Sequence, residues 1–149
     1  MKKIVELVLL KTEEGYRKEY EATYLHGTLN LRDIPVTFSA KDFDHIFFEP
    51  SGSPVGYQFS FRRARRMNFM RALLSGEIDI EIMFESDRGT IALFCEALEC
   101  VMYLRIRPGT GVLQVGSFFD FGKDHTKMLR KQKKKCVPIT IEELKEKVK

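Results

Sequence analysis

The sequence lacks any long apolar run. None of its stretches approaches the ~18–20 uninterrupted apolar residues that a membrane-spanning helix needs. The opening MKKIVELVLLKTEEG resembles a secretory signal only superficially, because Glu6 interrupts its apolar part and no small-residue cleavage site follows. We therefore expect no membrane among the partners of this protein.

Cysteine is also scarce. Cys95, Cys100 and Cys136 form an odd set with no CxxC spacing and no nearby histidine cluster. This pattern argues against a disulfide framework and against a structural zinc site. We expect a protein of the reducing cytoplasm that needs no metal and no cofactor.

Familiar catalytic motifs are missing as well. The chain has no Walker loop, GxGxxG, HExxH, EF-hand or GxSxG pattern. These absences argue against nucleotide hydrolases, zinc proteases and serine hydrolases.

What the chain does contain is enough apolar and charged material for one folded unit. Its 149 residues are 44% hydrophobic and 31% charged, which argues against a disordered or collagen-like chain. The length predicts a single domain over residues 1–149.

Positive charge is concentrated in two blocks. The net charge of +4 is unremarkable, but residues 123–135 hold seven lysines and arginines against one acid, Asp124. Residues 62–71 add five arginines and no acid. A field of this kind attracts a polyanion, so we expect a polyanionic partner.

Hydrophobic periodicity predicts strands at 4–10, around Tyr20–Leu25 and at 34–38. A helix with Ser39 as its N-cap follows and stops before Pro50. Apolar residues at 3.6-residue spacing predict a helix over 60–75, ended by Gly76.

After Gly76 the apolar period changes to two, which predicts four successive strands in an antiparallel meander. Residues 90–104 also fit an amphipathic helix, but the RPGTG hairpin signal that follows favours strands. A short helix is predicted at 141–149. The predicted fold class is therefore α+β, with N-terminal helices followed by a four-stranded antiparallel sheet.

Several polar residues are candidates for chemistry, each with an ordinary alternative. His125, beside Lys123 where the last strand ends, could instead lie in a solvated basic tail. His45, among aromatic residues of a short helix, could instead be a core histidine. Arg62 and Arg66 lie one helical turn apart and could grip one phosphate.

On the sheet, Arg105 and Arg107 could converge with Ser117, although Ser117 could equally be a filler beside Gly116. Glu96 is the obvious acidic neighbour of these groups in the sequence.

The order of these elements resembles a known group of nucleases. A short helix with His45, a helix reading RARRM-x-F-M-R-A-L and a sheet finishing in GSFFDF resemble the phage-associated nucleases of the barnase, EndoU, colicin and RelE-like superfamily. The resemblance covers residues 36–132 and leaves 133–149 as a basic tail and short terminal helix. It differs from well-known members in having Phe69 where tryptophan is expected in the helix. It implies a barnase/RelE-like scaffold and RNA cleavage without a metal.

In such a reaction a base deprotonates the ribose 2′-hydroxyl, an acid protonates the leaving 5′-oxygen, and cations stabilise the phosphorane. We assign His45 as base and His125 as acid. The supporting groups are Arg66 and Arg105 as clamps, Lys123 as a further cation and Ser117 as a donor. The residues predicted to bind the nucleic acid are Arg62, Arg63, Lys123, Lys127, Arg130 and Lys131.

Two other functions remain open at this point. A degenerate nuclease scaffold could bind nucleic acid without cleaving it. Alternatively, the protein could be a toxin or a phage-encoded or phage-defence component whose activity is masked by an inhibitory partner protein.

Overall fold

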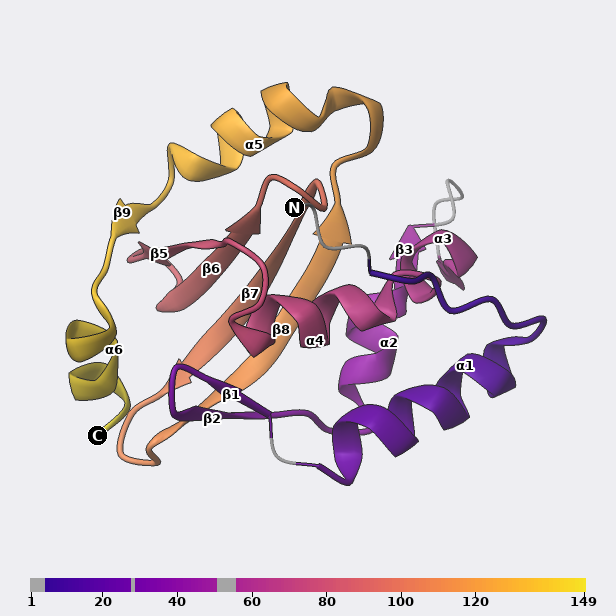
Figure 1. Cartoon of the computed structure of the whole chain (residues 1–149), viewed down its shortest axis with the longest axis horizontal. Helices are drawn as coiled ribbons and strands as arrows, with labels where there is room; N and C mark the ends of the chain where they lie inside the picture. Colours follow the sequence, from indigo (N-terminus) through magenta and orange to yellow (C-terminus); the bar gives the residue numbers. More distant parts are fainter. Residues whose placement is uncertain (1–4, 28, 51–55) are drawn as a thin grey trace.

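The computed structural model describes residues 5–27, 29–50 and 56–149, and its centre is a twisted seven-stranded sheet (Figure 1). The strand order is β1-β2-β8-β7-β6-β5-β9. The strands of this sheet are β1 (Leu29–Leu31), β2 (Ile34–Thr37), β5 (Glu81–Glu85), β6 (Thr90–Cys95), β7 (Cys100–Arg107), β8 (Val112–Asp120) and β9 (Val137–Pro138). A separate hairpin pairs β3 (Phe48–Pro50) with β4 (Tyr57–Phe59).

The prediction of a four-stranded antiparallel sheet after N-terminal helices is wrong. The predicted meander exists as β5 to β8, but the sheet continues beyond both of its edges. β2 adds to β8 in parallel, with Val36 opposite Leu113, and β9 adds to the free edge of β5. The partners β2 and β8 are far apart in the chain, so no local pattern announces their pairing.

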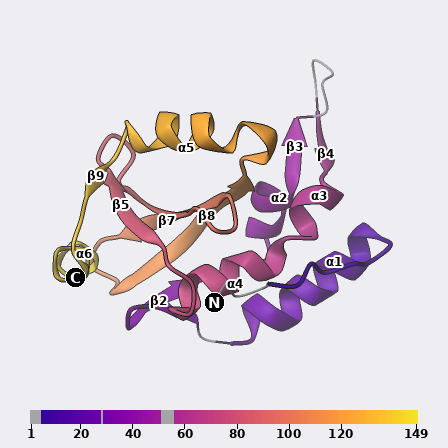
Figure 2. The same ribbon diagram turned by 45° about the horizontal axis from the view of Figure 1, so that its top comes forward.

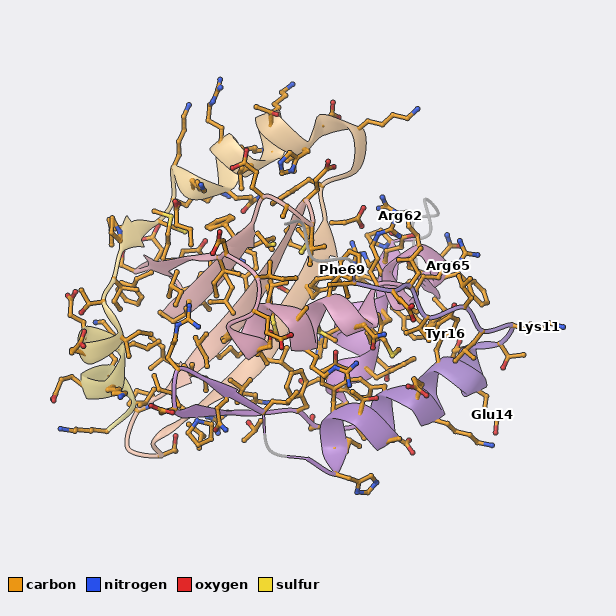
Figure 3. The ribbon with its side chains drawn as sticks, viewed as in Figure 1. Lys11, Glu14, Tyr16, Arg62, Arg65 and Phe69 are labelled. Carbon is orange, nitrogen blue, oxygen red and sulfur yellow. The ribbon has the colours of Figure 1, made fainter. Side chains whose placement is uncertain are left out.

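The N-terminal region is helical rather than stranded. Residues 5–10 form no strand, and position 4 lies outside the described residues. Helix α1 (Glu13–Tyr20) starts after Thr12, whose hydroxyl accepts a hydrogen bond from the Gly15 amide at 3.0 Å. A π-helical turn (Glu21–Leu25) follows. The tyrosines at 16, 20 and 24 share one buried face, and Tyr16 points from α1 towards α3 (Figure 3).

The other predicted helices are present in modified form. The expected helix over 60–75 is two helices, α3 (Phe61–Ala64) and α4 (Met67–Ser75), and Gly76 ends α4 in the left-handed conformation with φ 81°. Helix α2 (Asp42–Phe47) begins later than predicted. The prediction that Ser39 is its N-cap is wrong: the N-cap is Lys41, which makes no side-chain capping bond, and the Ser39 amide and hydroxyl donate to the Asp42 carboxylate.

The sheet separates two hydrophobic cores. On β6, Ile91 and Leu93 face the larger core beneath α4, whereas Ala92 and Phe94 face a smaller core. Helix α5 (His125–Lys133) covers the smaller core with Met128 and Leu129, so α4 and α5 lie on opposite faces of the sheet (Figure 2). Residues 125–133 thus form a packed helix, not the solvated tail that was the alternative for this region.

The chain ends in the predicted helix, α6 (Ile141–Val148), whose capping box is formed by Thr140 and Glu143. Strands rather than a helix at 90–104 are also confirmed, as β6 and β7. Within the described part of the chain, no helix has both the length and the apolar character needed to cross a bilayer.

Candidate functional site

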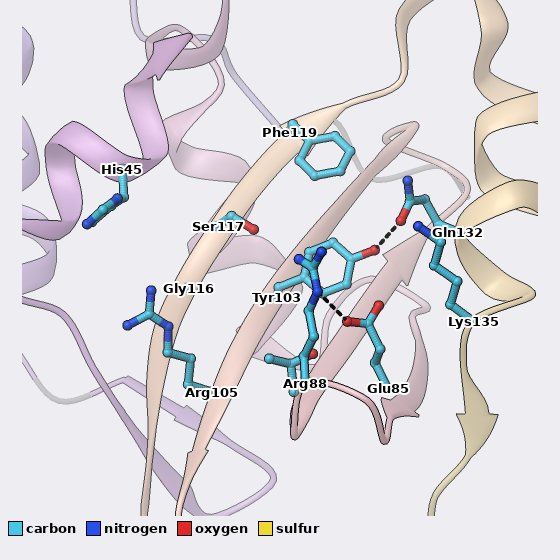
Figure 4. Close-up of a pocket in the computed structure, with 11 residues that line it drawn as sticks. His45, Glu85, Arg88, Tyr103, Arg105, Gly116, Ser117, Phe119, Gln132 and Lys135 are labelled. Carbon is cyan, nitrogen blue, oxygen red and sulfur yellow. Dashed lines mark hydrogen bonds and ion pairs between the residues drawn. The ribbon is translucent and has the colours of Figure 1, made fainter. Parts of the chain in front are cut away.

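A polar pocket of about 600 Å³ lies on the α5 side of the sheet. Its floor is formed by β7, β8 and the β5–β6 hairpin. His45 of α2 stands on one side, and Gln132 of α5 with the following Lys135 stands on the other (Figure 4). The pocket therefore collects side chains from elements that are far apart in the sequence.

A β-bulge shapes the floor of this pocket. Tyr103 pairs with Ser117, but the next residue of β7 pairs with Val115, so Gly116 is the extra residue. Both Phe118 and Val115 can then face the larger core while Ser117 lines the pocket. A Cβ at Gly116 would lie 3.2 Å from the Tyr103 carbonyl oxygen, which explains the glycine.

Glu85 is the buried carboxylate of this pocket, with only 6% of the residue exposed. Within the described chain, the other buried polar or charged residues are Asp42 and Ser60; Ser60 caps α3, and Asp42 accepts hydrogen bonds from the Ser39 amide and hydroxyl. Glu85, in contrast, is the last residue of β5 and caps no helix. Its nearest cation is the exposed Arg88, at 3.5 Å from guanidinium Nε to carboxylate oxygen, in the turn that follows β5.

A hydroxyl beside Glu85 lacks a partner. Thr90 is directly opposite Glu85 in the β5–β6 pairing, and its buried Oγ1 has no hydrogen-bond partner among the described residues. An unsatisfied buried polar group costs about 1–3 kcal/mol.

The α5 wall is fixed by two polar contacts. The Tyr103 hydroxyl donates to the Gln132 side-chain oxygen at 2.8 Å, and burial raises the pKa of Tyr103, so the phenol stays protonated and acts as a donor. Lys133 pairs with Glu81 of β5 at 2.9 Å. These contacts hold α5 over the sheet and keep Lys135 at the rim of the pocket.

The amphipathic pattern of α2 places His45. Phe43, Ile46 and Phe47 are buried against the core, which leaves Asp44 and His45 on the exposed side. Asp44 pairs with Arg17 at 3.0 Å. Because His45 is exposed and lines the pocket, it is not the core histidine that was the alternative for this residue.

The pocket favours an anion. Its charged lining consists of three cations, Arg88, Arg105 and Lys135, and one carboxylate, Glu85, apart from the titratable His45. A concave site with an excess of one sign concentrates ligands of the opposite sign. The arrangement thus combines an anion-binding rim with a buried carboxylate and an accessible imidazole.

The structure brings together three of the residues predicted for catalysis: His45, Arg105 and Ser117. It does not bring the other two to this pocket. His125 lies at the start of α5 with its ring 5.9 Å from that of Phe121, and its buried Nδ1 has no partner within the described chain. Arg66 lines a separate hollow and donates to the Arg62 carbonyl oxygen at 2.7 Å.

The predicted nucleic-acid-binding residues divide into two groups. Both arginines of α3 have structural contacts: Arg62 (Figure 3) pairs with Asp120 at 2.9 Å, and Arg63 donates to the Phe48 carbonyl oxygen at 3.2 Å. The second group is exposed on the segment containing α5: Lys123, Lys127, Arg130 and Lys131. Their role in binding stays a prediction.

Sequence reasoning missed Glu85, Arg88, Tyr103 and Lys135 as members of one pocket. It favoured Glu96, which is exposed in the turn between β6 and β7 and does not line the pocket. Period-two alternation on β5 could have placed Glu85 on the same face as Met83. That face is the one covered by α5.

Comparisons with known proteins give no further guide to this site. No family model, no curated protein and no solved structure matches the chain.

Proposed function

We propose that this protein is a metal-independent endoribonuclease that cleaves RNA by 2′-hydroxyl transesterification. The observation that carries the proposal is that Glu85 and His45 line one cation-rimmed pocket of about 600 Å³. Such a pocket can hold a sugar–phosphate link with a proton acceptor and a proton donor beside it.

The proposed roles follow from the chemistry of each group. Glu85, an acceptor when ionised, takes the proton from the ribose 2′-hydroxyl. The 2′-oxygen then bonds to phosphorus and the bond from phosphorus to the 5′-oxygen breaks, which leaves a 2′,3′-cyclic phosphate. Protonated His45 gives its proton to the departing 5′-oxygen.

The cations serve the transition state. Charge builds on the non-bridging oxygens of the phosphorane, and Arg88 and Arg105 line the pocket with guanidinium donors suited to them. Ser117 supplies a further hydroxyl donor from the bulge. His45 takes the acid role here, in place of the base role assigned from sequence, because Glu85 supplies the base.

Incubation of the purified protein with RNA in EDTA tests this function. We expect fragments that end in 2′,3′-cyclic phosphate, and no cleavage at a position whose 2′-hydroxyl is replaced by hydrogen. RNA that stays intact but remains bound to the protein would instead indicate a nucleic-acid-binding module. Cleavage that ignores the 2′-substitution would contradict the transesterification mechanism.

The exposed cations of α5 are expected to bind the RNA backbone outside the pocket. Replacing Lys127, Arg130 and Lys131 together by alanine should lower the slope of log affinity against log salt by about 2, at ~0.7 for each phosphate of a single strand that a cation no longer neutralises. The matched control replaces three exposed lysines elsewhere, Lys11, Lys18 and Lys145. Equal slopes in the two triple variants would exclude α5 from the interface.

A further inference from the structure

A second hollow lies beside the candidate site and shares a wall with it. This hollow, of about 360 Å³, is lined by Asp44, His45, Phe48 and Tyr57. His45 lines both the hollow and the polar pocket. A ligand that reaches past the imidazole would therefore enter the hollow directly.

Phe48 and Tyr57 give the hollow an aromatic surface beside Asp44 and His45. In the β3–β4 hairpin, Phe48 pairs with Phe59 and Pro50 with Tyr57, so Phe48, Phe59 and Tyr57 share one face. Phe48 packs edge-on against Phe59, with ring centroids 5.8 Å apart. Tyr57, in contrast, is 73% exposed. An aromatic ring this exposed offers a free face to a flat ligand.

Asp44, which supplies the carboxylate among the described residues that line the hollow, is already engaged, because it accepts from Arg17 at 3.0 Å. What the hollow offers is thus mainly an aromatic surface. Stacking on aromatic side chains is how proteins hold single-stranded bases with little sequence preference, since every base has a π face.

We propose that this hollow is a base-binding subsite, in which Tyr57 stacks on the base of a nucleotide next to the phosphate held in the polar pocket. The inference rests on the proposed ribonuclease function, which puts an RNA strand across His45. It makes the β3–β4 hairpin part of the substrate-binding surface. It also predicts that affinity gained at this position depends weakly on which base is present.

The test uses an RNA oligonucleotide that cannot be cleaved because its 2′-hydroxyls are methylated, with 2-aminopurine placed at each position in turn. On binding to the unaltered protein, fluorescence should be quenched at one position. The variant Tyr57→Ala should abolish that quenching and bind about 5- to 150-fold more weakly, the range expected when one base–aromatic stack is removed. Tyr57→Phe should retain both.

The matched control is Leu9→Ala, since Leu9 is an apolar residue with the same 73% exposure. Thermal unfolding of each variant shows whether it is folded. Unchanged affinity and quenching in Tyr57→Ala would overturn the subsite even if the protein cleaves RNA. Tyr57-dependent quenching without cleavage of ordinary RNA would support the subsite and overturn the nuclease. Failure to bind RNA would overturn both.

Discussion

We expect replacement of Glu85 with glutamine to lower kcat for the proposed RNA cleavage about 10²–10⁴-fold, the contribution typical of a general base. The amide keeps the shape and polarity of the carboxylate but cannot take up the 2′-hydroxyl proton. Glutamine fills the same buried space as Glu85, and Arg88 stays in place. We therefore expect the variant to fold and to bind non-cleavable RNA with nearly unchanged affinity. Single-turnover cleavage with saturating enzyme measures the chemical step.

Glu96→Gln is the matched control for this experiment. Glu96 is the acidic residue that the sequence favours, but it is exposed in the turn after β6. Its replacement should leave kcat unchanged. A large loss in Glu96→Gln together with full activity in Glu85→Gln would move the base out of the polar pocket and contradict the mechanism.

The difficulty of finding Glu85 from sequence has a physical cause. The alternation of Met83 and Glu85 on β5 is a local property, and strand periodicity reveals it. The burial of Glu85 is not local, because the face it shares with Met83 is covered by α5, about forty residues later in the chain. A charged residue at a strand end is usually solvated, so the local pattern alone predicts that Glu85 is exposed, which is wrong.

The position of His45 has a similar explanation. The sequence predicts β2 and a helix after Ser39, and both exist. What places His45 near Ser117 is the parallel pairing of β2 with β8, since α2 follows directly from β2. That pairing depends on contacts between distant segments, and the predicted meander left no place for it. The strand β2 and the helix α2 could therefore be predicted from the sequence, whereas the pairing that brings His45 to the pocket could not.

His125 was predicted to belong to the site but does not line the pocket. The sequence places it at a strand end among cations, which suggested an accessible acid beside the sheet. In the structure the chain turns through Gly122, and His125 begins a helix that packs its ring against Phe121. The same amphipathic helix that removes His125 from the pocket brings Gln132 to it.

We expect replacement of His45 with alanine to lower the rate of the proposed RNA cleavage about 10²–10⁴-fold, because its imidazolium is assigned to protonate the leaving group. A substrate with sulfur in place of the bridging 5′-oxygen separates this role from others. A thiolate is a far weaker base than an alkoxide and departs without a proton. On that substrate His45→Ala should cleave at nearly the unaltered rate, whereas Glu85→Gln should stay impaired.

The comparison of His45→Ala with His125→Ala decides between the acid assigned from sequence and the acid assigned from structure. His125 does not line the pocket, so its replacement should change neither substrate's rate by more than a few fold. His26→Ala, at an exposed position, controls for loss of an imidazole elsewhere. If His45→Ala lost equal activity on both substrates, its imidazole would act in binding or in positioning. If His125→Ala alone were rescued by sulfur, the acid would reach the phosphate from α5, and the polar pocket would need that helix to move.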